Sequence, residues 1–306
     1  MSPRLGRSII AAGPVKYDKA PVNRKRTRSV KTNDRQAPLA GIKALIIDMD
    51  GVLWHGSEPL PGIREFFRVL RERGMPFVLA TNNASSTPEQ YVEKLAAMGV
   101  AVETKEILTS GIATSAWLAQ RRDPGQTRVF AIGEAGLMEP LAREGFDLVG
   151  THKTTANWQA DVVVVGKDET LTWEKLATAT LNLNRGAEFV GTNADTTLPM
   201  ELGITHGNGA ILAALTAATG RHPVIIGKPE PELYRQALRR LQVAPQQVAA
   251  IGDRLETDIL GAVRAGIRSL LVLTGVSKEA DLEQVDYRPD WVLPDIRAVT
   301  RLLEVA

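Results

Sequence analysis

Hydrophobic residues gather in short runs along the chain from residue 41 onward, and longer stretches of mixed polarity separate these runs. The runs contain almost no polar residues, which is typical of parallel strands that are covered on both faces. We predict strands at residues 44–48, 77–80, 129–132, 162–165, 189–191, 224–226, 248–251 and 270–273.

Between these strands, apolar and polar residues recur with the period of an amphipathic helix. We predict helices at residues 62–73, 88–98, 173–184, 210–218, 231–241 and 256–265. The alternation of strands and helices indicates βαβ units, and therefore an α/β fold with a doubly wound, Rossmann-like parallel sheet. In such a fold, binding sites lie at the carboxyl ends of the strands.

The domain organisation follows from the length of the chain and the spacing of its polar strand ends. A chain of 306 residues is long enough for about two domains of ~150 residues. The long interval between Asn83 and Lys228 leaves room for an inserted α/β module with its own strands. We predict a core formed by residues 41–118 and 205–306, interrupted by an inserted α/β cap at residues 119–204.

The first 40 residues differ from the rest in charge. They carry ten Lys or Arg and two acidic residues, a charge of +8, whereas the remainder carries a charge of −6. The segment with Arg24, Lys25, Arg26 and Arg28 could contact nucleic acid or an anionic surface. Recurring prolines and the lack of apolar periodicity instead favour a basic, disordered leader. Nucleic acid is disfavoured as a partner of the remaining chain.

Composition excludes several classes of protein and site. The chain has no cysteine, which excludes disulfides, thiolate zinc sites and a cysteine nucleophile, and which favours a reducing compartment. No apolar stretch approaches the ~20 residues of a membrane span. The expectation is a cytoplasmic protein without a membrane partner. The sequence leaves a homodimer open.

Two aspartates follow the first predicted strand directly. Because side chains alternate along an extended chain, Asp48 and Asp50 project to the same side, and Met49 points back into the protein. Two adjacent carboxylates repel each other, so a hard divalent cation is their natural partner. Asp48 is a candidate nucleophile that can accept a phosphoryl group, and Asp50 is a candidate acid and base. The alternative is a pair of structural turn aspartates.

Polar signals also follow three other predicted strands. Thr81, Asn82 and Asn83 offer a hydroxyl, an amide and backbone N–H groups to a phosphate, although such a sequence is also ordinary turn chemistry. Lys228 stands close to a helix start, where anions are favoured. Asp253 is a candidate metal ligand, and Asp258 could orient Lys228; both could also be acidic residues of a first helical turn.

Taken in order, these four signals resemble the haloacid dehalogenase (HAD) superfamily. The resemblance covers residues 41–302 and is closest to subfamily IIA, the NagD and p-nitrophenyl phosphatase-like branch with a large α/β cap. The matching segments are Asp48-Met49-Asp50-Gly51-Val52-Leu53-Trp54, Thr81-Asn82-Asn83, Gly227-Lys228-Pro229-Glu230-Pro231 and Gly252-Asp253-Arg254-Leu255-Glu256-Thr257-Asp258-Ile259. The string 191–195 is similar to the segment that returns from the cap to the core.

The resemblance implies a chemistry for these residues. It implies Mg²⁺ held by Asp48, the backbone carbonyl of Asp50 and Asp253, and an aspartyl-phosphate on Asp48. Thr81, Asn82 and Lys228 would hold the phosphate. An aspartate rather than a threonine at position 50 matches the phosphatase pattern of this family.

Two departures from the family pattern bear on the substrate. His206 and Gly207 stand where the family often has Pro-Gly, and His206 is either a substrate contact or a surface residue. The segment 196–199 lacks the histidine of members that act on pyridoxal phosphate, so that substrate is disfavoured.

The predicted function is a Mg²⁺-dependent phosphatase that hydrolyses a small phosphorylated metabolite, such as a nucleotide monophosphate or a sugar phosphate. Two alternatives remain: a phosphotransferase of the same fold, and a non-catalytic binding protein that acts through its basic leader.

Overall fold

The computed structural model describes residues 39–305 except residue 201. The basic segment with Arg24, Lys25, Arg26 and Arg28 lies outside the described residues. Leu39 and Ile42 belong to the hydrophobic core. Leu39 is only 2% exposed, although the predicted leader extends to residue 40.

A six-stranded parallel sheet has the strand order β15-β14-β13-β1-β4-β5. Its strands are β1 (Ala44–Ile47), β4 (Phe77–Thr81), β5 (Ile107–Thr109), β13 (Val248–Gly252), β14 (Arg268–Val272) and β15 (Trp291–Leu293). In β1, Ile47 lies between Leu79 of β4 and Ile251 of β13. The ends of β1, β4 and β13 therefore meet at one edge of the sheet, next to the point where the strand order reverses.

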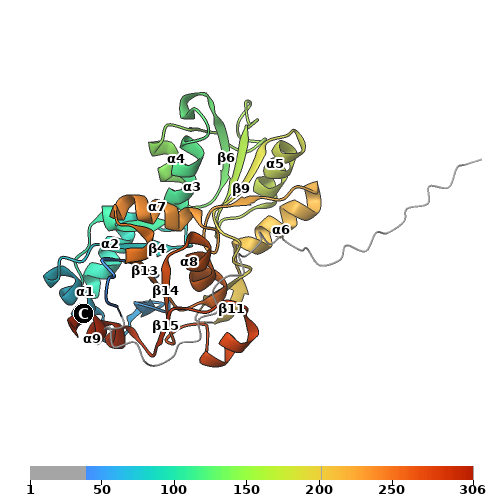
Figure 1. Cartoon of the computed structure of the whole chain (residues 1–306). Coiled ribbons are helices and arrows are strands. Elements are labelled where there is room, and N and C mark those ends of the chain that lie inside the picture. The colour runs from blue at the N-terminus through green and yellow to red at the C-terminus, as the bar shows by residue number, and fades with distance from the viewer. Residues whose placement is uncertain (1–38, 201, 306) are drawn as a thin grey trace, which may run out of the picture. The chain divides into compact units, whose positions relative to one another are not determined.

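Helices cover both faces of this sheet (Figure 1). Leu45 and Ile47 of β1 pack with α1 (Ile63–Glu72), α2 (Pro88–Ala97) and α9 (Ile296–Val305). Ala44 and Ile46 face the opposite side, with α3 (Ser110–Ala119), α7 (Glu232–Leu241) and α8 (Leu260–Ala265). This two-sided burial explains why the strand sequence is apolar throughout.

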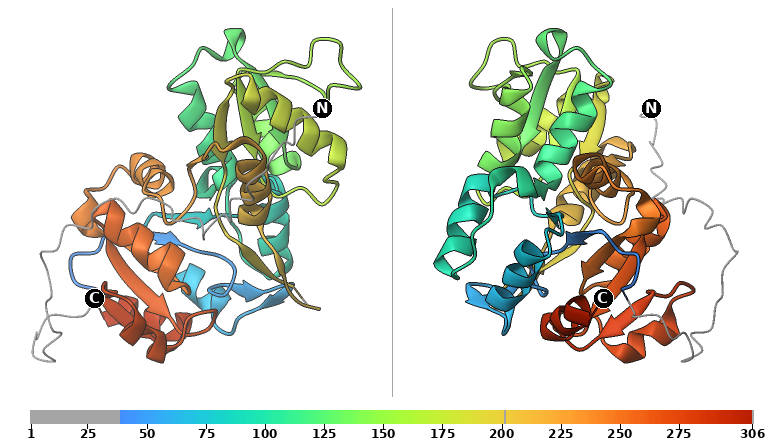
Figure 2. Two further views of the ribbon diagram at one scale, coloured as in Figure 1. Left: turned by 90° about the vertical axis from the view of Figure 1, so that its right-hand side faces the viewer. Right: turned by 60° about the vertical axis from the view of Figure 1, so that its left-hand side comes forward.

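A second, five-stranded parallel sheet has the order β12-β9-β8-β6-β7 (Figure 2). Its strands are β6 (Arg128–Ile132), β7 (Asp147–Leu148), β8 (Val162–Val165), β9 (Glu188–Gly191) and β12 (Val224–Ile225). The valines of β8 alternate between two cores, one with α4 (Ala135–Arg143) and the other with α5 (Trp173–Asn184) and α6 (Asn208–Thr219). The α/β fold class is thus confirmed.

Two short antiparallel hairpins complete the sheets. The first joins β2 (Trp54–His55) to β3 (Glu58–Pro59), and the second joins β10 (Thr197–Met200) to β11 (Gly203–His206). The first hairpin begins at the last residue of the 48–54 string, and the second follows the 191–195 string.

All eight predicted strands are present, with ends that differ by up to two residues. The sequence analysis missed the helices α3, α4 and α9. It also missed β5 and β15 of the first sheet, β7 of the second sheet and the four short hairpin strands. In α3 seven of the ten residues are buried and the other three are partly buried, so the sequence lacks the amphipathic period that marks a helix. The segment predicted as one α-helix at residues 256–265 consists of two parts. It begins with a π-helical turn, Leu255–Ile259, and continues as the α-helix α8.

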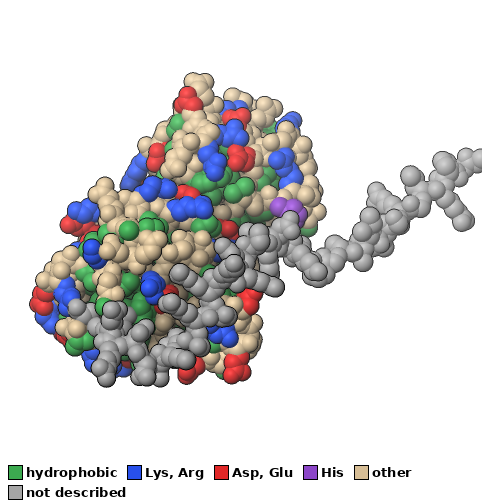
Figure 3. All heavy atoms as spheres, in the orientation of Figure 1, with side chains coloured by type: hydrophobic (Ala, Val, Ile, Leu, Met, Phe, Trp, Pro, Cys, Tyr) green, Lys and Arg blue, Asp and Glu red, His purple; other side chains and the backbone are tan. Residues whose placement is uncertain are grey.

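The described helices are too short or too polar to cross a bilayer. Lys and Arg side chains are interspersed with Asp and Glu side chains over the face of the molecule that Figure 3 shows. A cytoplasmic location stays a prediction.

Candidate active site

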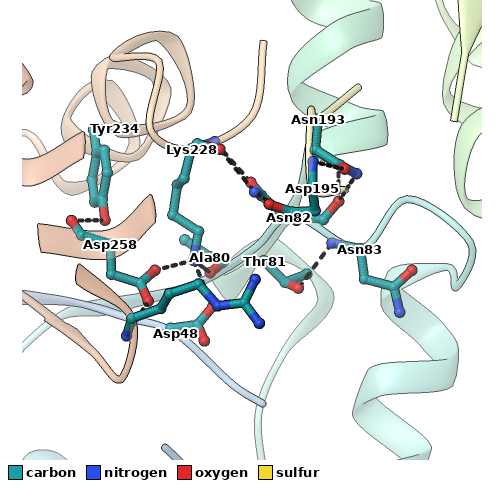
Figure 4. A network of polar contacts seen from close by, with 12 residues as sticks. Asp48, Ala80, Thr81, Asn82, Asn83, Asn193, Asp195, Lys228, Tyr234 and Asp258 are labelled. Carbon is teal, nitrogen blue, oxygen red and sulfur yellow. Dashed lines mark hydrogen bonds and ion pairs between the residues drawn. The ribbon is translucent and has the colours of Figure 1, made fainter. Parts of the chain in front are cut away.

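Lys228 joins two of the predicted aspartates at the carboxyl edge of the six-stranded sheet. Its Nζ donates to Asp48 Oδ1 at 2.5 Å, to Asp258 Oδ1 at 2.6 Å and to the carbonyl of Ala80 at 3.1 Å (Figure 4). The side chains of Lys228 and Asp258 are each 3% exposed, and that of Asp48 is 13% exposed. Three segments separated by many residues thus meet in one buried ion-pair network.

The electrostatics of this network show an excess of negative charge. Burial raises the pKa of Asp48 well above its usual value; Lys228 lowers it, and Asp258 and Asp253 raise it further. Burial, with the charge of Asp258, raises the pKa of Asp253 to about 6. Burial opposes the charge of Lys228, but Asp258 and Asp48 raise its pKa well above normal. A further cation would stabilise the ionised carboxylates.

The donor set fits a hard divalent cation. Asp48, Asp253 and Asp258 bring carboxylate oxygens within 4.8 Å of one another. Asp258 is already engaged, because its Oδ1 binds Lys228 and its Oδ2 accepts the Arg254 N–H at 3.1 Å. Asp48 and Asp253 therefore present the oxygens that a cation such as Mg²⁺ prefers.

Gly51 allows the loop after β1 to approach Asp253. It has φ of +80°, a left-handed conformation that favours glycine. A Cβ atom at this position would lie 2.6 Å from Asp253 Oδ2. The same Oδ2 accepts the Val276 N–H at 2.7 Å, so its orientation is fixed from the other side.

Asp50 lies on the same side of the chain as Asp48, as the alternation of side chains predicts. Both line one cavity, whereas Met49 is fully buried. Asp50 is exposed, and its Oδ1 accepts the indole N–H of Trp54 at 2.7 Å. The two predicted catalytic carboxylates therefore occupy different environments, one in a buried ion pair and one facing the cavity.

The predicted phosphate-binding residues also reach the cavity. Asn82 has both ends of its amide engaged, because Oδ1 accepts the Lys228 N–H at 2.7 Å and Nδ2 donates to the Lys228 carbonyl at 2.9 Å. Thr81 Oγ1 accepts the Asn83 N–H, which leaves the hydroxyl hydrogen of Thr81 free to donate. The side-chain oxygen of Asn83 accepts two bonds from Ser85. The side chain of Asn82 thus holds the backbone of Lys228 in place.

Sequence reasoning assigned no role to two residues of the returning segment. Asp195 Oδ2 accepts from Asn82 Nδ2 at 3.1 Å, and Asn193 Nδ2 donates to the Asn82 carbonyl at 2.8 Å. Burial raises the pKa of Asp195 above its usual value. The sequence marked Asn193 and Asp195 in one way, since both lie in the 191–195 string. His206, in contrast, is exposed and lies outside the cavity lining.

The cavity that these residues line has a volume of about 450 Å³. One wall comes from the ends of β1, β4 and β13, and another from residues 193–198 and the start of α6. The cavity can hold a small metabolite next to Asp48. Its chemistry is that of anionic oxygen ligands, one buried ammonium and one exposed carboxylate.

Comparisons with known proteins agree with this geometry. The family described as haloacid dehalogenase-like hydrolase matches residues 45–147, and a second HAD-hydrolase-like family matches residues 225–299. The chain is 37% identical over 262 residues to the acid sugar phosphatase of Staphylococcus saprophyticus, covering 86% of this chain and 98% of that protein. It is 36% identical to a 5′-nucleotidase of Bacillus subtilis, covering 82% and 97%.

A solved structure of a relative has the same fold. The glycerol phosphate phosphatase of Mycobacterium tuberculosis, in complex with magnesium, superposes with a TM-score of 0.79 at 34% identity. The match covers 87% of this chain and 79% of that protein.

Proposed function

The chain belongs to the haloacid dehalogenase-like hydrolases, in the NagD and p-nitrophenyl phosphatase-like branch (subfamily IIA), and we propose that it hydrolyses a small phosphomonoester through an aspartyl-phosphate on Asp48. It is a phosphatase of that family. The substrate that we propose is a sugar phosphate or a nucleotide monophosphate, in line with the names of the two curated relatives.

The contact between Asp48 and Lys228 is the observation that supports this proposal most directly. A carboxylate that approaches a buried ammonium at 2.5 Å, at the wall of a cavity, is an oriented nucleophile beside a cation. Lys228 can offset the charge on the phosphoryl oxygens as the phosphoryl group is transferred. Asp258 serves as the residue that orients Lys228.

The remaining site residues have complementary roles in this proposal. Asp50 protonates the leaving oxygen and later activates water. Thr81 holds the phosphoryl group through its hydroxyl, and Asn82 holds it through its backbone N–H, because the side chain of Asn82 is already engaged. Asn83 supports this phosphate site, because its N–H donates to Thr81 Oγ1 and so orients the hydroxyl.

Mg²⁺ fits this site, and we propose it as the cofactor. Asp48, the backbone carbonyl of Asp50 and Asp253 would hold it. When bound, it would neutralise charge on the phosphoryl oxygens and on the two carboxylates. The magnesium in the mycobacterial relative supports this choice.

The second sheet is proposed as a cap that selects the leaving group. The predicted cap covers residues 119–204, but β12 (Val224–Ile225) still pairs with β9 in the second sheet. This pairing favours a cap that extends to Ile225, with the core resuming at Lys228. Closure of such a cap would exclude water from the site.

Phosphate release from a panel of sugar phosphates, nucleotide monophosphates and 4-nitrophenyl phosphate tests the proposal, with Mg²⁺ and with EDTA. We expect metal-dependent release that falls by about ten-thousand-fold or more in Asp48→Asn, since the nucleophile is lost. Asp147→Asn, at an exposed position in the second sheet, is the matched control and should retain full activity. Undiminished turnover by purified Asp48→Asn would overturn the covalent role.

The two alternatives give different results in the same assay. A phosphotransferase would form a new phosphate ester when an alcohol such as glycerol is added in excess, with a matching loss of free phosphate. A non-catalytic protein would release none. Removal of residues 1–36, which spares the buried Leu39, is expected to leave kcat unchanged. Sedimentation velocity would show whether the protein forms a homodimer, which the sequence leaves open.

A further inference from the structure

A buried indole holds the carboxylate of Asp50. The Nε1–H of Trp54 donates to Asp50 Oδ1 at 2.7 Å, and Trp54 is completely buried whereas Asp50 is exposed. Among the residues that the structure describes, Trp54 provides the sole side-chain hydrogen bond to this carboxylate. An exposed aspartate would otherwise sample several rotamers.

The indole itself is held on several sides. Trp54 begins a hairpin strand whose partner residue is Pro59, and its carbonyl accepts the Gly51 N–H at 2.8 Å. The ring stacks against Tyr91, with centroids 6.4 Å apart. Lys94 Nζ lies 4.2 Å from the centroid of the ring, and it also donates to the Gly56 carbonyl at 2.8 Å. The donor to Asp50 therefore comes from a rigid element.

The chemistry of indole makes this contact directional. Indole N–H is a donor without acceptor capacity, so Oδ1 of Asp50 accepts from it and Oδ2 is the oxygen that the indole leaves unengaged. Oδ2 is therefore the oxygen from which Asp50 can donate to a substrate. A hydroxyl or a water in place of the indole could both donate and accept, and would not distinguish the two oxygens in this way.

We propose that Trp54 is a positioning residue, which directs the protonated oxygen of Asp50 toward the leaving group of the substrate. This inference rests on the proposed function. An Asp48 oxygen attacks phosphorus, the bond from phosphorus to the ester oxygen breaks, and the Oδ2 proton of Asp50 moves to that oxygen. The products of this step are the free alcohol, the aspartyl-phosphate on Asp48 and an Asp50 carboxylate.

Two substrates that differ in their need for an acid separate this role from a structural one. The leaving 4-nitrophenolate is stable without a proton, whereas the alkoxide that leaves glycerol 3-phosphate is not. The value of kcat/KM reports steps up to the departure of the leaving group. It is therefore insensitive to the later hydrolysis of the aspartyl-phosphate, in which Asp50 also acts.

We expect Trp54→Phe to lower kcat/KM for glycerol 3-phosphate by about tenfold or more, because a positioned acid contributes at least that factor. The loss for 4-nitrophenyl phosphate should be several times smaller. Lys94→Met should cause a weaker loss with the same preference. Trp117→Phe is the matched control, since Trp117 is also buried with a cation, Arg121, 4.5 Å from its ring centroid, and it should leave the ratio of the two values unchanged.

The outcomes distinguish this inference from the function on which it rests. A wild-type protein that releases phosphate from neither of these substrates and from no sugar phosphate or nucleotide monophosphate would refute the proposed function. Equal losses for both substrates in Trp54→Phe, or no loss in either, would refute the positioning role. If Trp54→Phe folds poorly, benzothienylalanine at position 54 replaces the N–H by sulfur in a ring of similar shape. The same selective loss is then expected.

Discussion

The two walls of the cavity differ in how firmly their side chains are held. One wall, which we call the core wall, contains Asp48, Lys228 and Asp258. The side chains of these residues are at most 13% exposed and share one network of short contacts. On the other wall, the β10–β11 hairpin contributes Thr197 and Leu198 to the cavity. Farther along this hairpin, side chains are open to solvent, with Ile204 78% exposed.

This difference matches two requirements of an enzyme. Groups that act on the phosphoryl group must be held in precise positions, and strand ends in a buried sheet provide such positions. Groups that select the leaving group can vary between relatives, and an exposed hairpin tolerates such variation. We therefore expect changes on the core wall to affect every substrate, and changes on the hairpin to affect some.

Removal of the metal should have the largest effect among the changes that leave Asp48 in place. EDTA should lower kcat/KM by about 100-fold or more for all substrates, because a bound cation contributes several kcal/mol to the transition state. Added Mg²⁺ should raise the Tm of the wild type, since a ligand stabilises the state that binds it. Asp253→Asn should show no such rise. A substrate that is hydrolysed equally well in EDTA would contradict the role of the core wall.

Loss of Lys228 should be the next largest effect. Lys228→Met leaves Asp48 and Asp258 buried without their cation, which should lower the free energy of unfolding by about 3 kcal/mol. The double variant Lys228→Met/Asp258→Asn should recover part of this loss. Arg68→Met, which breaks an exposed pair with Glu72, is the control. It should hardly change the midpoint of urea unfolding or the Tm of thermal unfolding.

A methyl group at Gly51 should disturb the core wall through its backbone. Gly51→Ala combines a left-handed φ with a Cβ that lies 2.6 Å from Asp253 Oδ2, so we expect a loss of about 2 kcal/mol in stability and weaker Mg²⁺ binding. Gly74→Ala has φ of +58° but an open surrounding, and should cost about 1 kcal/mol without any effect on metal affinity. Calorimetric titration with Mg²⁺ compares the two.

The hairpin should yield the smallest and most selective effect. Leu198→Ala removes apolar surface from the cavity wall, and we expect KM to rise by up to about tenfold for substrates with bulky leaving groups. The kcat for 4-nitrophenyl phosphate should stay within about twofold. An equal loss for every substrate would show that the hairpin also supports the chemistry, and would end the distinction between the walls.

The sequence was most informative where function coincides with a local pattern. Asp48 and Asp253 each follow an apolar strand, and parallel strands bring such ends to one edge. Their proximity could therefore be predicted without knowledge of side-chain packing. The helices that were missed show the limit of the same approach, since α3 is buried on nearly all sides and lacks the polar face on which the prediction depends.

Contacts between segments that are far apart in the chain could not be predicted from the sequence. Asn82 and Asp195 are 113 residues apart, and nothing in either segment indicates that one amide holds both Asp195 and the backbone of Lys228. Likewise, the pairing of β12 with β9 follows from the path of the chain through the second sheet. Local patterns carry no information about such pairings.

The sequence by itself determined the α/β class, the order of the strand-end motifs and the residue types of the site, because these depend on side-chain alternation and local composition. The tertiary structure alone decided which oxygen of each carboxylate is engaged. Asp258 is occupied by Lys228 and the Arg254 amide, and Asp50 by the indole of Trp54. The physical reason is that hydrogen bonds depend on distances of a few tenths of an ångström, which only the packed chain sets.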